Sequence, residues 1–259
     1  MTIRAGAEPF AHRPAGRSRI GVLLLHGFTG SPAAVRPWGQ FLAGQGLAVE
    51  VPLLPGHGTS WRALNRTTWQ DWYAEAERAF LGLREHCDEV LVMGLSMGGT
   101  LSLRLAEVHG TAVAGLVLVN PAVHTERRDA ALLPLLARIV PSFPAIGNDI
   151  KREGVDEIAY PRLPLRAAQS LSRLWGVVRA EIGQVTQPLL LLRSEVDHVV
   201  EPSNARWILS HVHSVDITVI VLPNSFHVAT LDNDAPTIHR ESVSFISRVT
   251  GWQPDPAGD

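Results

Sequence analysis

The segment Gly94-Leu95-Ser96-Met97-Gly98 has the residue types and spacing of a serine nucleophile. An apolar, strand-like run precedes this segment, and a helix-like stretch follows it. A sharp turn between a strand and a helix holds a serine in a strained conformation with its hydroxyl exposed, and the flanking glycines allow close packing. The motif alone is short enough to occur by chance, so the context carries the prediction. We predict that Ser96 is a catalytic nucleophile.

A serine hydroxyl needs a general base near neutral pH, and the sequence offers 11 histidines. In parallel sheets with this motif, the acid and then the histidine follow the serine, each in a loop after a later strand. His227 follows the apolar run Ile217 to Leu222 after a short loop, so we predict that it is the base. The remaining histidines precede Ser96 or lie away from that loop: His12, His26, His57, His86, His109, His124, His198, His211, His213 and His239.

The acid that orients the base should follow the preceding apolar run, Leu189 to Leu192. Two carboxylates stand there, Glu195 and Asp197. The short side chain of Asp197 suits a turn that accepts a proton from His227 while staying ionised. We predict Asp197 in this role, with Glu195 as the alternative.

Two backbone N–H groups are needed to hold the oxyanion of a tetrahedral intermediate. One belongs to the residue after the nucleophile, Met97. The other should come from the loop after an early strand, Leu25-His26-Gly27-Phe28-Thr29-Gly30, where Gly27 permits a sharp turn. We predict the N–H of Phe28 as the second donor, and we expect His26 to hold the loop by hydrogen bonds.

Short apolar runs rich in Val, Ile and Leu recur along the chain, each bounded by turn residues. Such runs are typical of strands buried on both faces of a parallel sheet. The predicted strands are Ile20 to Leu25, Val49 to Leu54, Val90 to Met93, Val113 to Val119, Leu189 to Leu192 and Ile217 to Leu222. The predicted helices include Trp38 to Gly46, Trp69 to Glu85 and Met97 to His109. This alternation predicts an α/β fold with a mostly parallel central sheet flanked by helices.

The interval between Val119 and Leu189 is too long for a simple crossover between strands. It contains an apolar stretch, Ala130 to Val140, and then a charged stretch, Asp149 to Glu157. The interval is too small to bury a core of its own. We therefore predict a single domain, residues 1–259, with a small helical cap inserted at about residues 122–173.

The composition argues against several classes of function. Of the 259 residues, 46% are hydrophobic and 19% are charged, and the formal net charge is −2. This balance does not indicate a nucleic-acid partner. We find neither a secretory signal nor a membrane-spanning run, so we expect a cytoplasmic protein. The scattered histidines and the single cysteine, Cys87, have no zinc-binding spacing. We therefore predict no metal and no cofactor.

Taken together, the motifs resemble those of the bacterial monoacylglycerol lipases and carboxylesterases of the α/β-hydrolase superfamily. The resemblance covers nearly the whole chain through GVLLLHGFTGSP, LLPGHGTS, TTWQDW, GLSMGGTLSL, DHVV and NSFHVATLD. The family's triad falls on Ser96, Asp197 and His227, and its oxyanion donors fall on Phe28 and Met97. The resemblance implies a serine hydrolase of carboxylic esters, above all monoacylglycerols, that acts through an acyl-enzyme.

The resemblance also implies that cap residues line an apolar tunnel for the acyl chain, although such stretches more often pack into a core. These residues are Leu132, Leu133, Leu135, Leu136, Ile139, Val140 and Phe143. For the two hydroxyls of a monoacylglycerol, Glu157 or Asp156 is a candidate acceptor. We expect a small-molecule lipid ester as substrate, transient contact of the cap with lipid surfaces at the membrane periphery, and a monomer or homodimer.

Other functions fit the same residues, because fold and triad do not fix the substrate. The main alternative is a broad carboxylesterase for short and medium acyl chains. Carbon–carbon hydrolysis, peptidase action and acyl transfer also remain open. Two alternatives lie in other classes: a small-molecule receptor without turnover, and a protein that docks on membranes through its cap. Dehalogenase chemistry is disfavoured because it requires a carboxylate at the position of Ser96.

Overall fold

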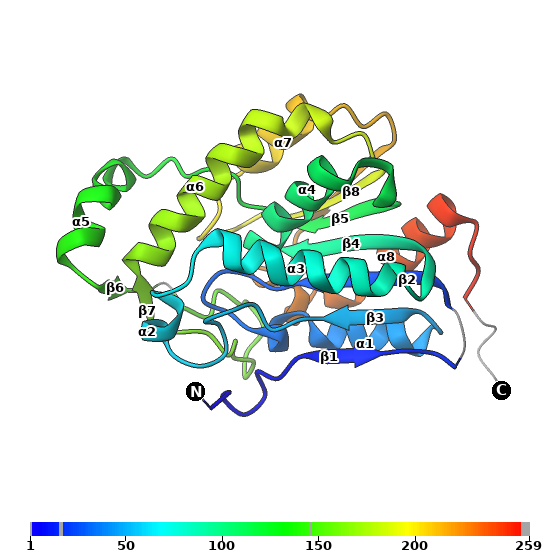
Figure 1. The fold of residues 1–259 in the computed structure, drawn as a ribbon, viewed down its shortest axis with the longest axis horizontal. Coiled ribbons are helices and arrows are strands. Elements are labelled where there is room, and N and C mark those ends of the chain that lie inside the picture. The colour runs from blue at the N-terminus through cyan, green and yellow to red at the C-terminus, as the bar shows by residue number, and fades with distance from the viewer. Residues whose placement is uncertain (1, 16–17, 146, 255–259) are drawn as a thin grey trace.

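A computed structural model describes residues 2–15, 18–145 and 147–254. In this part of the chain the main sheet has seven strands, in the order β1-β3-β2-β4-β5-β8-β9. The strands are β1 (Phe10–His12), β2 (Ser18–Leu25), β3 (Ala48–Val51), β4 (Cys87–Leu95), β5 (Gly115–Val119), β8 (Leu189–Ser194) and β9 (Ile217–Leu222). All pairings are parallel except that of β1 with β3. The predicted mostly parallel sheet flanked by helices is confirmed (Figure 1).

The helices cover both faces of this sheet. They are α1 (Arg36–Gly44), α2 (Trp61–Leu64), α3 (Trp69–Arg84), α4 (Met97–His109), α5 (Leu133–Ile139), α6 (Leu165–Glu181), α7 (Ser203–His211) and α8 (Ala235–Thr250). Helices α1 and α8 pack on one face, and α3, α4 and α6 pack on the other. In the described part of the chain, none of the helices combines the length and apolar character that crossing a membrane requires.

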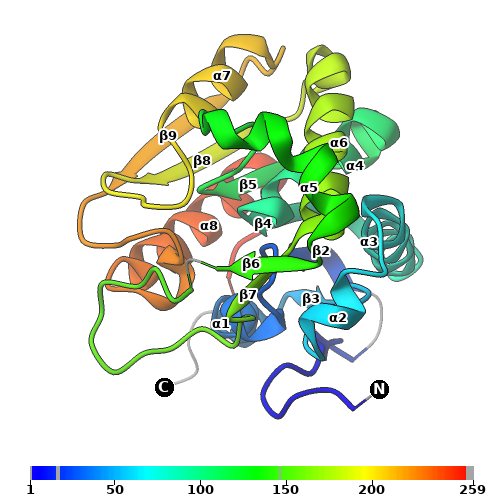
Figure 2. The same cartoon turned by 90° about the vertical axis from the view of Figure 1, so that its left-hand side faces the viewer.

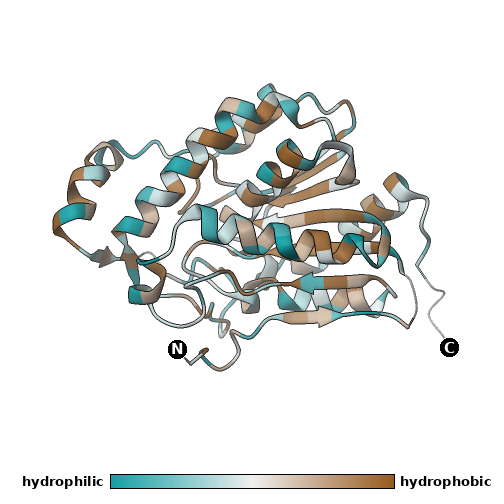
Figure 3. Ribbon diagram, in the orientation of Figure 1, coloured by the Kyte–Doolittle hydropathy of each residue, from teal (hydrophilic) through white to brown (hydrophobic). Residues whose placement is uncertain are grey.

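Burial of the strands on both faces explains their continuous apolar sequences. In β2, Val22 and Leu24 belong to the core beneath α1 and α8. Leu23 and Leu25 belong to the core beneath α3 and α4. Figure 3 shows the result, since the central strands are hydrophobic along their length while the outer helices mix both kinds of residue.

The last predicted strand differs from this pattern. β9 pairs only with β8 among the described strands and therefore forms an edge of the sheet. Val219 and Val221 on this strand are 44% and 43% exposed. The prediction that Ile217–Leu222 is buried on both faces was therefore wrong, because an apolar run alone does not distinguish an edge strand from a central one.

The chain between β5 and β8 leaves the sheet and returns. It forms a 3-10 helix (Arg128–Leu132), then α5, and then a small antiparallel pair of strands, β6 (Ser142–Pro144) and β7 (Arg162–Pro164). These elements lie beyond the ends of the parallel strands (Figure 2). Helix α6 then returns to the body and packs on α4 and α3.

The side chain of Asn65, in the body, joins the two segments that flank the β6–β7 pair. Asn65 donates from Nδ2 to the carbonyl of Pro141 at 3.2 Å. Its Oδ1 accepts from the backbone N–H of Arg166 at 2.9 Å, at the start of α6. The body therefore holds the inserted elements at their root by side chain to backbone hydrogen bonds.

Candidate active site

Ser96 lies at the turn between β4 and α4, with φ +56° and ψ −115°. A positive φ is uncommon for a residue other than glycine, and such strain is concentrated at functional sites. Neighbouring elements hold the turn in place. The N–H of Ser96 donates to the carbonyl of Val119 at 2.9 Å, and the N–H of Thr100 donates to the carbonyl of Ser96 at 3.2 Å. The sheet and α4 together therefore fix the strained serine.

The two outer glycines of the motif are required by close backbone contacts. A Cβ on Gly94 would lie 2.3 Å from the carbonyl carbon of Gly98. A Cβ on Gly98 would lie 2.0 Å from the carbonyl oxygen of Leu25. The first turn of α4 therefore packs directly on the end of β2, and this contact places Ser96 beside the loop that follows β2.

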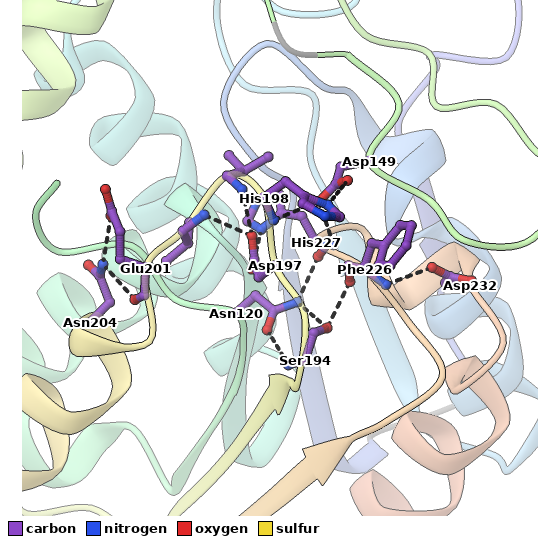
Figure 4. A network of polar contacts seen from close by, with 12 residues as sticks. Asn120, Asp149, Ser194, Asp197, His198, Glu201, Asn204, Phe226, His227 and Asp232 are labelled. Carbon is purple, nitrogen blue, oxygen red and sulfur yellow. Dashed lines mark hydrogen bonds and ion pairs between the residues drawn. The ribbon is translucent and has the colours of Figure 1, made fainter. Parts of the chain in front are cut away.

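His227 and Asp197 meet at the carboxyl edge of the same sheet (Figure 4). The Nδ1 of His227 lies 2.8 Å from Oδ2 of Asp197. The second oxygen of Asp197 accepts the backbone N–H groups of Val199 and Val200, both at 2.8 Å. Both side chains are more than nine-tenths buried. The carboxylate is therefore held in a fixed orientation toward the imidazole.

The pKa values of this pair support proton transfer. Burial alone would raise the pKa of Asp197, but the hydrogen bond and charge of His227 and the two backbone donors lower it. Burial alone would lower the pKa of His227. The bond and charge of Asp197, with the charges of Glu157 and Asp149, raise it above the ordinary value of 6.5. The imidazole is therefore a better proton acceptor than an isolated histidine.

The N–H groups of Phe28 and Met97 are available for an incoming group. Among the described residues, no carbonyl accepts a hydrogen bond from either. The two loops lie close together, because a Cβ on Gly27 would be 3.5 Å from Cβ of Ser96. Two free N–H donors beside a serine are the arrangement that stabilises an oxyanion.

His26 and His57 form a buried pair under the loop after β2. The Nε2 of His26 accepts the N–H of Leu54 at 3.3 Å, and its Nδ1 contacts the carbonyl of Gly27 at 3.0 Å. Burial lowers the pKa of His26 to about 4, and burial with the neighbouring His26 lowers that of His57. Both rings are therefore neutral, as suits a structural role. The described residues contain no group of three or more His, Cys, Asp and Glu side chains that could hold a metal ion.

Of the two candidate acceptors for the substrate hydroxyls, Glu157 and Asp156, only Glu157 lies against the loop after β2. Its Oε1 is 2.5 Å from the position of a Cβ on Gly30. No described residue donates a hydrogen bond to its carboxylate, and burial raises its pKa to about 7. Asp156 is exposed and accepts a hydrogen bond from Asn148 at 2.6 Å.

The apolar residues of the cap divide into two groups by exposure. Leu132, Leu135, Ile139 and Phe143 are exposed, and Ile139 reaches 73%. Leu133, Leu136 and Val140 are half-buried. The first three exposed residues recur at intervals of three and four and so share one face of the 3-10 and α5 segment.

The sequence did not reveal the residues that support the histidine loop. Asn120, directly after β5, has a positive φ of 44°. Its Nδ2 donates to the carbonyl of His227 at 2.8 Å and to Oγ of Ser194 at 3.0 Å. Ser194 in turn donates from Oγ to the carbonyl of Phe226 at 2.7 Å (Figure 4). In the sequence, the only indication was an asparagine directly after a predicted strand. Its hydrogen-bond partners could not be predicted, because they lie 74 and 107 residues away along the chain.

Known proteins match this chain over nearly its full length. The thermostable monoacylglycerol lipase of Bacillus sp. (strain H-257) is 39% identical over 251 residues, 96% of this chain and 98% of that protein. The carboxylesterase of Bacillus subtilis (strain 168) is 26% identical over 245 residues, 93% of this chain and 97% of that protein.

Solved structures agree. One reported for metagenome-derived lipolytic enzymes, LipS and LipT, has a TM-score of 0.91 at 39% identity, covering 95% of this chain and 100% of that chain. A monoacylglycerol lipase of Paleococcus ferrophilus shares the fold, with a TM-score of 0.76 at 20% identity and coverages of 93% and 99%. The model of the serine aminopeptidase S33 family (Hydrolase_4) matches residues 16–234. The chain therefore belongs to this family of α/β-hydrolases.

Proposed function

We propose that this protein is a serine hydrolase that cleaves carboxylic esters, with monoacylglycerols as its substrates. The observation that carries the proposal is the strained Ser96 between two free N–H donors, at the same sheet edge as the buried pair of His227 and Asp197. The lipolytic relatives at 39% identity support the choice of a glycerol ester.

In the first half of the reaction, Oγ of Ser96 attacks the ester carbonyl while Nε2 of His227 takes the hydroxyl proton. Asp197 holds the Nδ1–H of the ring and stabilises the imidazolium that forms. The N–H groups of Phe28 and Met97 donate to the oxyanion, where each such donor is worth about 2.7 to 4 kcal/mol. The intermediate then collapses, and the alcohol leaves with the proton from His227.

In the second half, water replaces the alcohol. His227 takes a proton from the water, whose oxygen attacks the acyl carbonyl on Ser96. The same two N–H groups hold the second oxyanion. Collapse returns the proton to Oγ of Ser96 and releases the carboxylic acid. The chain's own residues thus carry every proton transfer.

Glu157 supplies an acceptor for the glycerol hydroxyls in this proposal. Its carboxylate lies against Gly30, in the loop that also carries Phe28, and lacks a donor among the described residues. Glu157 is half-buried, and an acceptor shielded from water without a partner costs free energy that a hydroxyl donor recovers. The half-buried cap residues Leu136 and Val140 would then contact the acyl chain.

The exposed cap residues support a second part of the proposal, that α5 contacts lipid surfaces while substrate enters. Leu132, Leu135 and Ile139 place three large apolar side chains on one exposed face. Transfer of such surface from water into an apolar medium is favourable.

The experiment compares kcat/KM for a monoacylglycerol and for a p-nitrophenyl ester of the same acyl chain. We expect both esters to react with the wild type and neither with Ser96→Ala. Glu157→Gln should lower kcat/KM for the monoacylglycerol about tenfold, because hydrogen bonds to charged groups are worth about 1.5 to 3 kcal/mol. The same substitution should alter the p-nitrophenyl reaction much less.

Other outcomes discriminate among the alternatives. Reaction with simple esters but not with glycerides would make the protein a broad carboxylesterase; the Bacillus subtilis relative is named a carboxylesterase. Equal losses on both esters in Glu157→Gln would remove this residue from glycerol recognition. Absence of multiple turnovers on any ester would favour a receptor that retains the hydrolase fold.

A further inference from the structure

Asp149 lies in the inserted segment, yet it contacts both loops that carry the acid and the base (Figure 4). Its Oδ2 accepts the backbone N–H of His227 at 3.1 Å and that of His198 at 3.2 Å. Its Oδ1 lies 2.8 Å from Nδ1 of the His198 ring. Its own carbonyl accepts the N–H of Val228 at 3.1 Å. One inserted residue therefore bridges the residue after Asp197 and His227 itself.

A second aspartate makes the reverse connection. Asp232, in the loop after His227, is fully buried. Its carboxylate accepts the backbone N–H groups of Lys151 at 2.7 Å and Arg152 at 2.9 Å, both from the insert. It also accepts the N–H of Phe226 at 2.9 Å. Asp149 of the insert thus accepts backbone N–H groups of the loop that carries His227, and Asp232 of this histidine loop accepts backbone N–H groups of the insert.

We propose that Asp149 is a positioning residue, which holds His227 and the Asp197 loop in their reactive arrangement from the insert. The proposal rests on the proposed function, because it concerns the base and acid of that reaction. It also divides the insert into two parts. Residues 148–152 are joined to the histidine loop, whereas α5 packs on α6, where Nε of Arg166 donates to the carbonyl of Ala137 at 3.4 Å.

The charges around His227 make this role measurable. Three carboxylates raise the pKa of His227 through their negative charge. They are Asp197, from the loop after β8, and Glu157 and Asp149, from the insert. Loss of the Asp149 charge should therefore lower the pKa of His227. A residue that only filled space would leave that pKa unchanged on isosteric replacement.

The test is Asp149→Asn, which keeps the shape and removes the charge. The amide oxygen can accept both backbone N–H groups, and the amide NH2 then faces Nδ1 of His198, which must serve as the acceptor. We expect kcat to fall about tenfold or more, since small displacements of a catalytic group cost that much. KM should change little. The acid limb of the pH profile of kcat/KM should move to lower pH.

The matched control is Glu153→Gln, which removes an exposed carboxylate from the same segment of the insert. It should leave kcat and the pH profile as in the wild type. Wild-type kcat and pH profile in folded Asp149→Asn would overturn the proposal, and so would an equal effect of Glu153→Gln. If Asp149→Asn does not fold, His198→Ala provides the test. It removes the imidazole that contacts Oδ1 of Asp149 and should lower kcat about threefold.

The titration of His227 followed by NMR separates this proposal from the proposed function. A lower pKa in Asp149→Asn supports the positioning role even if no tested ester is hydrolysed. An active wild type with an unchanged His227 titration in Asp149→Asn leaves the hydrolase intact and overturns only the positioning role.

Discussion

At the scale of single residues, the conformation of Ser96 depends on the absence of side chains at Gly94 and Gly98. Ser96 adopts its positive φ because Gly94 and Gly98 allow β4 and α4 to approach β2 without a side chain between them. The strain is therefore maintained by backbone contacts rather than by a hydrogen bond of the serine side chain.

Gly98→Ala should disrupt this turn. The added Cβ would lie 2.0 Å from the carbonyl oxygen of Leu25, in backbone that cannot easily shift. We expect a loss of about 1 to 3 kcal/mol in the free energy of unfolding, typical of overpacking. The value of kcat/KM should fall about a hundredfold as the N–H of Met97 is displaced. Urea denaturation and ester hydrolysis measure the two effects.

Gly176→Ala provides the control, because Gly176 lies in α6 and no described atom beyond its chain neighbours and the adjacent helix backbone lies within 4 Å of a Cβ. Alanine is favoured over glycine in a helix by up to about 1 kcal/mol. This variant should be as stable as the wild type or more stable, and fully active. A similar loss in both variants would show that steric contact at Gly98 is not the cause.

At the scale of elements, α4 and α6 meet through a partly buried cluster of charges. Arg104 on α4 contacts Glu107 at 3.0 Å and Glu181 of α6 at 2.6 Å. The Glu107 side chain is fully buried, and its Oε1 has no hydrogen-bond partner among the described residues. Burial raises the pKa of Glu107 to about 8, and Arg104 opposes this shift only in part.

This carboxyl makes the stability depend on pH. Its pKa is 4.5 before burial and about 8 in the folded protein. The folded state therefore binds more protons than the unfolded state between those values, and stability falls as pH rises through that window. Glu107→Gln should remove this decrease in stability, because glutamine does not titrate. Arg104 keeps Glu181 as its ion-pair partner in the variant.

Thermal melts from pH 5 to pH 9 measure this effect. At pH 9 we expect the free energy of unfolding of Glu107→Gln to exceed that of the wild type by about 1 kcal/mol or more. Glu85→Gln, at the exposed end of α3, is the control and should leave the pH dependence unchanged. A constant difference between Glu107→Gln and the wild type at every pH would contradict the argument.

At the scale of the whole molecule, the inserted elements lie at the edge of the sheet that carries the candidate site (Figure 2). Leu132, Leu135 and Ile139 are exposed on one face of this segment, and the proposal assigns that face to contact with lipid. Ile139→Ser should lower partition onto phosphatidylcholine vesicles about tenfold, since burial of an isoleucine contributes about 1.5 to 3 kcal/mol.

Vesicle flotation in the Ser96→Ala background measures this partition without hydrolysis. Val215→Ser is the control, because Val215 is fully exposed and lies before β9, outside the cap. It should bind vesicles as the wild type does. Equal binding by Ile139→Ser and the wild type would show that α5 is not the contact surface.

The fold class was predicted correctly from the sequence, and the candidate site was predicted from its motifs. Apolar runs identified the central strands, and Met97 to His109 agrees with α4 at both ends. The order of serine, acid and histidine selected Ser96, Asp197 and His227, because parallel strands deliver their following loops to one edge. The strands and helices could be predicted because each depends on residues that are neighbours in the chain, and the triad because its order follows the order of the strands.

The residues that hold this site in place became apparent only from the folded structure. The contacts of Asn120, Asp149 and Asp232 join segments up to 107 residues apart, and no local pattern encodes such pairs. Tertiary packing also made β9 an exposed edge strand and brought Glu157 against Gly30. Burial and hydrogen bonding arise when distant segments meet, so the chemistry could be inferred from local sequence while its geometric control could not.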